Sequence, residues 1–111
     1  MAESKRISDI NTVVVSGRLV DDAKLGKTAT STFLKFTVAS NEYYEDKDGN
    51  PQKKTDFIDV IKWGPRAEKL AEVAIKGKPV TVVGKISVDS VETGEGNRRL
   101  WQVRANSVDF V

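Results

Sequence analysis

Residues 55–77 read TDFIDVIKWGPRAEKLAEVAIKG, and their periodicity changes at Gly64-Pro65. Before this pair, apolar and polar residues alternate from Thr55 to Trp63, as they do in a half-buried strand. After it, Lys76-Gly77 provides a helix stop. Between the two signals, four apolar residues have the i, i+3, i+4 and i+7 spacing of a short amphipathic helix: Ala67, Leu70, Ala71 and Ala74. The stretch predicts a strand followed directly by a short helix.

Four more strands are predicted around this stretch, two before it and two after it. Residues 12–20 (TVVVSGRLV) are dense in β-branched residues, which favour strands. Residues 32–41 (TFLKFTVASN) alternate, with Leu34, Phe36 and Val38 on one face and Phe33, Lys35 and Thr37 on the other. Residues 79–91 and 98–111 predict the last two strands.

The segments between these strands carry turn residues. Residues 21–31 (DDAKLGKTATS) are small and polar and are interpreted as a turn. Residues 43–54 contain Asp-Gly-Asn-Pro and predict a long hairpin with a charged tip, and residues 93–97 predict another turn. Gly17 and Gly84 lie within predicted strands, where glycine often marks a bulge or a sharp bend.

The predicted fold is all-β with one short helix, in the order β-β-β-α-β-β. This order is typical of the OB-fold, a five-stranded Greek-key barrel that binds oligonucleotides or oligosaccharides on its second and third strands. A helix after the third strand, closing one end of the barrel, favours this fold over a meander sandwich. We expect residues 1–111 to form a single OB-fold domain, with a flexible N-terminus at residues 1–9.

The composition excludes several classes of protein and of site. The 111 residues include no Cys and no His, which excludes disulfides, Cys/His zinc sites and His-based catalytic triads. No apolar run is long enough to span a membrane, and residues 1–5 are too polar for a secretory signal. The net charge of +2 does not by itself indicate a nucleic-acid partner, so a binding function must follow from the arrangement of residues.

Motifs in four of the predicted strands and in the helix share the pattern of one known family. They are Asn11-Thr12-Val13-Val14-Val15 with Gly17-Arg18-Leu19, Phe36 with Val38-Ala39, Thr55-Asp56-Phe57-Ile58, Val60-Ile61-Lys62-Trp63-Gly64-Pro65, Ala67-Glu68, Leu70-Ala71, Lys76-Gly77, and Val103, Ala105, Val108 and Phe110. From about Ile10 to the C-terminus, the chain resembles bacterial single-stranded DNA-binding proteins.

The resemblance implies a non-catalytic protein that binds single-stranded DNA largely independently of sequence and protects it in replication, recombination and repair. We expect no cofactor, no metal and no membrane association. The resemblance also implies a homotetramer, with residues 11–15 contributing dimer contacts, in the bacterial cytoplasm at the nucleoid or in an organelle. Family members continue into an acidic tip that recruits repair partners, but this sequence ends at Val111 without such residues, as a portion of a longer protein or a tailless protein would.

Stacking aromatic side chains and a basic groove are the usual means of binding single strands without reading their sequence. Phe57 and Trp63 share a strand face with Asp59, so they are predicted to point outward, and both match stacking positions of the family. Tyr44 matches a third such position, whereas Tyr43 beside it points the other way in a strand and packs inward in this interpretation.

Further candidates are weaker when judged from the sequence alone. Phe33, on the face of Lys35, is a fourth stacking candidate; for Phe33 and Tyr44, partial burial is the alternative. Trp101 follows two arginines, and core, interface and stacking roles all remain open for it. Seven cations, each of which is also an ordinary surface charge, are candidates for phosphate contacts: Lys35, Lys62, Arg66, Lys53, Lys54, Arg18 and Lys85.

Two features depart from the family pattern. Asp89 and Val91 stand where basic and aromatic residues are common, and the loop at Asp22-Ala23 lacks the usual proline. The alternative function is therefore an OB-fold paralogue or subunit that has weakened nucleic-acid binding and assembles with protein partners. A small oligosaccharide-binding barrel is a third reading, without support from the motifs.

An enzyme is not predicted. Strand alternation explains the carboxylate pair Asp56 and Asp59, and a turn explains Asp21 and Asp22. Gly94-Glu95-Gly96 lacks both the following helix and the Gly-Lys-Ser/Thr of a phosphate-binding loop.

Overall fold

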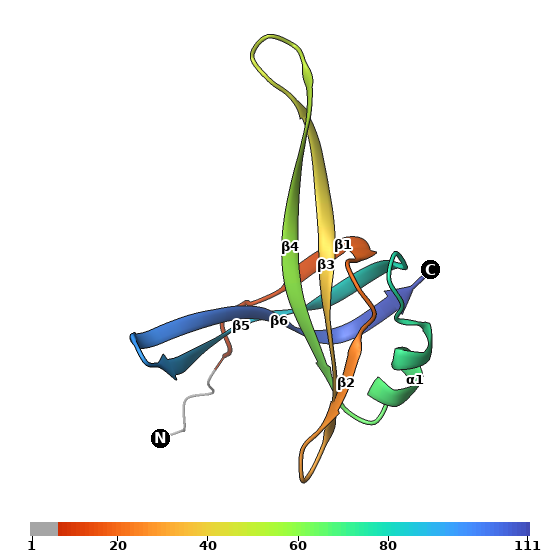
Figure 1. Cartoon of the computed structure of the whole chain (residues 1–111), viewed down its shortest axis with the longest axis vertical. Helices are drawn as coiled ribbons and strands as arrows, with labels where there is room; N and C mark the ends of the chain where they lie inside the picture. Colours follow the sequence, from red (N-terminus) through yellow and green to blue (C-terminus); the bar gives the residue numbers. More distant parts are fainter. Residues whose placement is uncertain (1–6) are drawn as a thin grey trace.

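The computed structural model describes residues 7–111, which form six strands and one short helix (Figure 1). The expected flexible N-terminus, residues 1–9, lies largely outside these described residues. In chain order the elements are β1 Val13–Leu19, β2 Lys24–Lys27, β3 Thr32–Glu45, β4 Pro51–Trp63, α1 Ala67–Val73, β5 Pro79–Thr93 and β6 Gly96–Phe110.

Five of the strands close into a barrel. They are hydrogen-bonded in the order β1-β5-β6-β4-β3, and β3 returns to β1 at the pair Arg18 and Ala39. The contacts are antiparallel except that of β4 with β6, which is parallel at Val60 and Val103. The predicted five-stranded barrel with one short helix is confirmed.

The barrel interior is lined by residues that the alternation pattern predicts to face inward. Leu34, Phe36 and Val38 alternate along β3, and all three are buried. Helix α1 covers the barrel with its apolar stripe, in which Ala67 and Ala74 are buried. The other buried members of this core are Leu19, Val60, Val80, Val82 and Val103. Because burial of one large aliphatic side chain contributes about 1.5–3 kcal/mol, this cluster is the main source of stability.

The interpretation of residues 21–31 as a turn is wrong for Lys24–Lys27. These four residues form β2, which pairs with β3 from Lys24 opposite Lys35 to Lys27 opposite Thr32. The Thr28 N–H donates to the Ser31 carbonyl oxygen at 2.8 Å and closes the hairpin. The segment KLGK has no strand pattern of its own, so its conformation depends on the backbone groups that the edge of β3 offers.

Two hairpins extend well beyond the barrel (Figure 1). β3 and β4 stay paired as far as Glu45 and Pro51, and β5 and β6 as far as Thr93 and Gly96. These strands are longer than the sequence predicts. Beyond the barrel both faces of a hairpin meet solvent, so backbone pairing continues without any hydrophobic alternation to reveal it.

The two strand glycines lie where backbones approach each other closely. At Gly84 the register of β5 against β6 shifts, which agrees with the first of the two expected alternatives, a bulge or a sharp bend. A Cβ there would collide with the Arg104 carbonyl oxygen. At Gly17 a Cβ would collide with the carbonyl oxygen of Ala39, where β1 leaves β5 and crosses to β3. Both positions therefore require glycine for closure of the barrel.

Candidate nucleic-acid interface

On the outer face of β3 and β4, cross-strand residue pairs of different chemical character follow one another along the strands. Side chains that share a strand face are two residues apart, which is about 7 Å along a strand. The register places four successive pairs on this face: Phe33 with Trp63, Lys35 with Ile61, Thr37 with Asp59, and Ala39 with Phe57. An aromatic pair, a cation, a polar pair and a second aromatic ring therefore follow one another along the two strands.

The first pair is an aromatic contact. The ring centroids of Phe33 and Trp63 are 5.0 Å apart, with the ring planes inclined at 56°. Phe33 is half-buried because its ring lies over Gly26 of β2, where a Cβ would collide with the ring. Trp63 remains 37% exposed, and the Lys35 ammonium lies 5.7 Å from the Phe33 centroid. The pair leaves part of the indole and a nearby cation exposed to solvent.

Phe57 is the most open aromatic ring of the barrel wall. Its side chain is 66% exposed, and the small side chain of Ala39 lies opposite it. A phenyl ring exposed to this extent contributes little to the core. The outward orientation predicted for Phe57 and Trp63 is confirmed by their exposure; base stacking by either residue remains a prediction.

A row of cations crosses four strands between these aromatic rings. Lys35 is opposite Ile61, Ile61 is opposite Arg104 of β6, and Arg104 is opposite Lys85 of β5. Ile61 is only 3% exposed although it lies on the outer face and outside the core cluster, which we attribute to the aliphatic stems of its charged neighbours. Arg104 was not among the cations expected from the sequence, because its place in this row depends on the parallel contact of β4 with β6.

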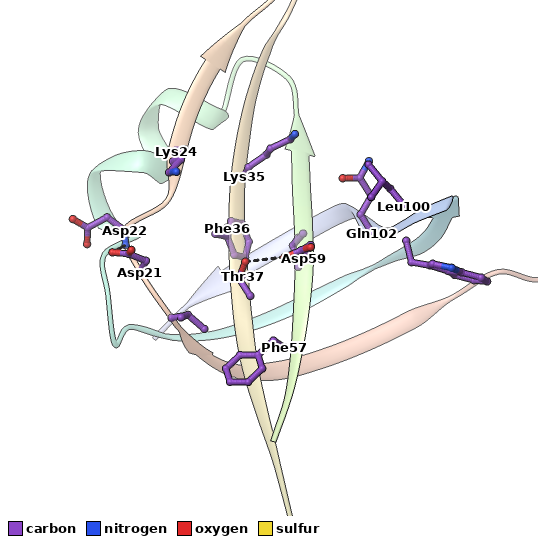
Figure 2. Close-up of a pocket in the computed structure, with 13 residues that line it drawn as sticks. Asp21, Asp22, Lys24, Lys35, Phe36, Thr37, Phe57, Asp59, Leu100 and Gln102 are labelled. Atoms are coloured by element: carbon purple, nitrogen blue, oxygen red, sulfur yellow. Dashed lines mark hydrogen bonds between the residues drawn. The ribbon is translucent and has the colours of Figure 1, made fainter. Parts of the chain in front are cut away.

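An open groove of about 530 Å³ lies beside this face (Figure 2). Its walls come from the loop before β2, from the outer face of β3 and β4, and from the β6 arm of the second hairpin. In an OB barrel the corresponding strands and loops form the ligand-binding surface. The polar and aromatic residues that line it are Asp21, Asp22, Lys24, Lys35, Phe36, Thr37, Phe57, Asp59, Trp101 and Gln102.

Trp101, for which the sequence left three roles open, lies on the rim of this groove. Its indole is 62% exposed, which excludes a core role. Trp101 and Phe57 line both the groove and an adjoining cavity of about 310 Å³. A core residue, Val103, lies on the same face of β6, but Trp101 is exposed because the hairpin has left the barrel there.

Three of the predicted phosphate ligands are engaged elsewhere. The Lys62 ammonium lies on the strand face opposite that of Trp63 and donates to the Asn106 carbonyl oxygen at 2.9 Å. The Arg18 guanidinium donates to the Gly77 carbonyl oxygen at 3.0 Å. The Lys54 ammonium is 3.7 Å from the Asp56 carboxylate. The structure therefore brings Lys35 and Lys85 together in one row but does not bring these three cations to it.

The remaining predicted residues lie at the two ends of the face. Arg66 is exposed immediately before α1, close in sequence to Trp63. Lys53 is opposite Tyr43 on the long hairpin, on the face that Phe57 shares. The inward packing of Tyr43 is wrong, because its side chain is 74% exposed. Tyr44 is exposed as well, but on the opposite face of the hairpin.

Two carboxylates of this region, those of Asp22 and Asp46, hold backbone groups in place. An Asp22 oxygen accepts from the Lys76 N–H at 2.7 Å, which ties the loop before β2 to the turn after α1. At the hairpin tip, the backbone N–H of Asn50 is the main cause that lowers the pKa of Asp46. Asp56 and Asp59 lie on opposite strand faces and do not form a carboxylate pair.

Among residues 7–111, no group of three or more acidic side chains lies close enough together to hold a metal ion. Within the same range, the one helix is too short to cross a membrane.

Comparison with known proteins gives a consistent result at the level of sequence and of fold. Single-stranded DNA-binding protein 1 of Streptococcus pyogenes serotype M18 (strain MGAS8232) is 37% identical over 90 residues, covering 80% of this chain and 68% of the relative. The single-stranded DNA-binding protein of Clostridium tetani (strain Massachusetts / E88) is 36% identical over 104 residues, covering 92% of this chain and 70% of the relative. For the relative from Streptococcus pneumoniae serotype 4 (strain ATCC BAA-334 / TIGR4), the chain spans 56% of its length.

Two solved structures have the same fold. The SSB of Plasmodium falciparum, in complex with ssDNA, superposes with a TM-score of 0.82 at 18% identity, covering 96% of this chain and 97% of that chain. A deletion mutant of the single-stranded DNA-binding protein from Thermus aquaticus superposes with a TM-score of 0.82 at 22% identity, covering 92% of this chain and 50% of that chain. Residues 10–111 match the model of the Single-strand binding protein family, and the chain therefore belongs to this family.

Proposed function

We propose that the chain binds single-stranded DNA without catalysis, on the outer face of β3 and β4, and protects exposed strands during replication, recombination and repair. The observation that carries this proposal is the exposure of Phe57 and Trp63 on one face, with the row of Lys35, Arg104 and Lys85 between them. Membership of the family supports the same function.

The geometry suits a flexible strand better than a duplex. Stacking of one base on an aromatic ring contributes roughly 1–3 kcal/mol and tolerates any base, whereas bases in a duplex are already stacked on each other. Cations between the rings would neutralise the phosphates that link the stacked bases. We propose stacking roles for Trp63, Phe57 and Phe33 on this face, for Tyr44 on the opposite face of the long hairpin, and for Trp101 on β6. We propose phosphate contacts for Lys35, Lys85, Arg104, Lys53 and Arg66.

The test is a fluorescence titration with a single-stranded oligonucleotide of mixed sequence. The only two tryptophans of the sequence, Trp63 and Trp101, are exposed in this region, so stacked bases should quench their emission. We expect strong quenching at low salt and weaker binding at higher salt, because phosphate contacts release counterions. A duplex of the same length is the control. An unchanged spectrum at low salt, together with unchanged anisotropy of a labelled oligonucleotide, would overturn the proposal.

We also propose a homotetramer, located with DNA in the bacterial cytoplasm, in which the β1 region contributes dimer contacts. Val14 of β1 and Ile10 before it are both largely exposed in the single chain, and contact with a second copy would bury them. Light scattering measures the assembly directly. Val14→Lys should reduce the measured mass, whereas a variant of the charged hairpin tip such as Asp48→Asn should leave it unchanged.

A second candidate function is supported by the outer part of the hairpin of β5 and β6. Val88, Val91 and Leu100 are all exposed there, and Asp89 accepts a hydrogen bond from Gln102 at 3.3 Å. Exposed apolar side chains beside a carboxylate suit a protein partner better than a phosphate backbone, and the two arginines of this arm, Arg98 and Arg99, could pair with acidic groups of that partner. This function predicts that Val91→Lys strengthens DNA binding; weakening by the same change would contradict it.

A further inference from the structure

Four cross-strand pairs lie on the outer face of β3 and β4 between Trp63 and Phe57, and Asp59 is the one acidic side chain among them. Phosphates avoid a carboxylate, so its presence in a groove for DNA needs another partner. Asp59 lines the groove (Figure 2). It also lines the adjoining cavity, which Phe57 and Trp101 share. Asp59 and Phe57 are neighbours on one face of β4, about 7 Å apart along the strand, so Asp59 is next to any base stacked on that ring.

The carboxylate of Asp59 is oriented but not neutralised. The Thr37 hydroxyl donates to one of its oxygens at 2.8 Å across the two strands. Among residues 7–111 the ion pairs are Lys27 with Glu68 and Lys54 with Asp56, and neither includes Asp59. The second oxygen of Asp59 therefore keeps its capacity to accept a hydrogen bond from a ligand in the groove.

The edges of the bases differ in what they offer to an acceptor. Cytosine, adenine and guanine each carry an exocyclic amino group that donates, and a carboxylate is the usual acceptor for the cytosine amino group. Thymine and uracil carry carbonyl oxygens on both sides of a single ring N–H, and these oxygens repel a carboxylate. An acceptor-only side chain beside a stacking ring therefore separates bases with an amino group from those without one.

We propose that Asp59, positioned by Thr37, selects the base that stacks on Phe57 and favours cytosine, adenine or guanine over thymine. The inference rests on the proposed binding of single-stranded DNA to this face. Single strands of every sequence then bind through stacking and phosphate contacts. The base on Phe57 adds a graded preference among them. Specificity here is a difference of affinities, to which both the attraction of an amino group and the repulsion of a carbonyl oxygen contribute.

The experiment compares oligo(dC) with oligo(dU) of equal length at pH 8. The two bases have the same ring size and no methyl group, and they differ at position 4 and in the proton on N3. We expect the wild type to bind oligo(dC) about five-fold more tightly, at the low end of base discrimination because the groove is open to solvent. Asp59→Asn replaces an acceptor by a group that both donates and accepts, so the ratio of affinities should fall close to one.

Two other variants separate the effect of hydrogen bonding from that of charge. Asp109→Asn removes the same charge on β6 away from the groove and should leave the ratio unchanged. Thr37→Val keeps the carboxylate but removes the hydroxyl that orients it, and should reduce the ratio partly. Thermal unfolding of each variant checks that the barrel is intact.

Each outcome has a definite meaning. Equal affinity of the wild type for both oligonucleotides, or a preference that survives in Asp59→Asn, would overturn the role of Asp59 while the proposed function stands. A uniform gain of affinity in Asp59→Asn with an unchanged ratio would also overturn it, since the carboxylate would then act only by repelling phosphate. If the wild type binds neither oligo(dC) nor oligo(dU), both the proposed function and this inference are overturned.

Discussion

The rings of Phe33 and Trp63 face each other across β3 and β4, with centroids 5.0 Å apart and planes inclined at 56°. This contact holds the indole at the end of the candidate interface, while Phe57 stands alone and more exposed at the other end. The two aromatic sites therefore differ in exposure and in aromatic neighbours. Trp63 is held by a neighbour, and Phe57 depends on a base to cover it.

Phe57→Ala should weaken binding of single-stranded DNA without unfolding the protein. Loss of one stacking ring corresponds to about 1–3 kcal/mol of binding free energy. Because Phe57 is exposed, the melting temperature should change little. Phe36→Ala is the matched control on the inner face, where removal of a buried ring costs about 3–5 kcal/mol of folding free energy. A large stability loss in Phe57→Ala would contradict its surface role.

Gly26→Ala should disturb the contact between Phe33 and Trp63, because Gly26 of β2 lies against the Phe33 ring. A Cβ at Gly26 would collide with the Phe33 ring, which would have to turn away from Trp63. An aromatic pair is worth about 0.5–1.5 kcal/mol, so affinity for single strands should fall by a corresponding, modest factor. The Trp63 emission spectrum should change in the free protein. Gly94→Ala, at a turn with open space around it, is the control and should have neither effect.

Lys35→Gln and Arg104→Gln should each reduce the salt dependence of binding. In a plot of log affinity against log salt, one phosphate contact on a single strand contributes a slope of about −0.7. Each variant should therefore bind less tightly at low salt and show a slope that is shallower by about this amount. Lys62→Gln is the control, because its ammonium is held by the Asn106 carbonyl oxygen on the other face. An equal loss of slope in Lys62→Gln would contradict the assignment of the row.

The tip of the hairpin of β3 and β4 should lose order in acid. Hydrogen bonds, chiefly from the backbone N–H of Asn50, lower the pKa of Asp46 below its ordinary value of 3.8. The ionised carboxylate is thus favoured in the folded turn. The stability that it gives the turn is present at neutral pH and is lost as the pH falls below 3.8 and through the lower pKa of the folded state. Amide NMR shifts and exchange at Asp48 and Asn50 should report this loss. Asp46→Asn should show faster amide exchange already at neutral pH.

Much of the fold follows from local patterns in the chain. Alternation of Leu34, Phe36 and Val38 placed the inner face of β3 correctly, because a strand buried on one side has a period of two residues. The apolar stripe from Ala67 to Ala74 placed the helix for the analogous reason. The same alternation, together with Asp59, put Phe57 and Trp63 on the outside.

Other parts of the structure depend on contacts between segments far apart in the sequence. Strand β2 exists because β3 offers a free edge, and the tips of the long hairpins are paired through backbone groups that leave no hydrophobic pattern. The orientation of Tyr43 could not be read from alternation, since the hairpin has no inside at that distance from the barrel.

For the interface, alternation along β3 and β4 is enough to identify the available rings and the strand face on which they stand, because alternation is a local property. The charges beside these rings are set by contacts between distant segments of the folded chain. The parallel contact of β4 with β6 brings Arg104 beside Ile61, and carbonyl groups from distant segments engage Lys62 and Arg18. A long cationic side chain is directed by the nearest acceptor in space, and sequence spacing does not specify that acceptor.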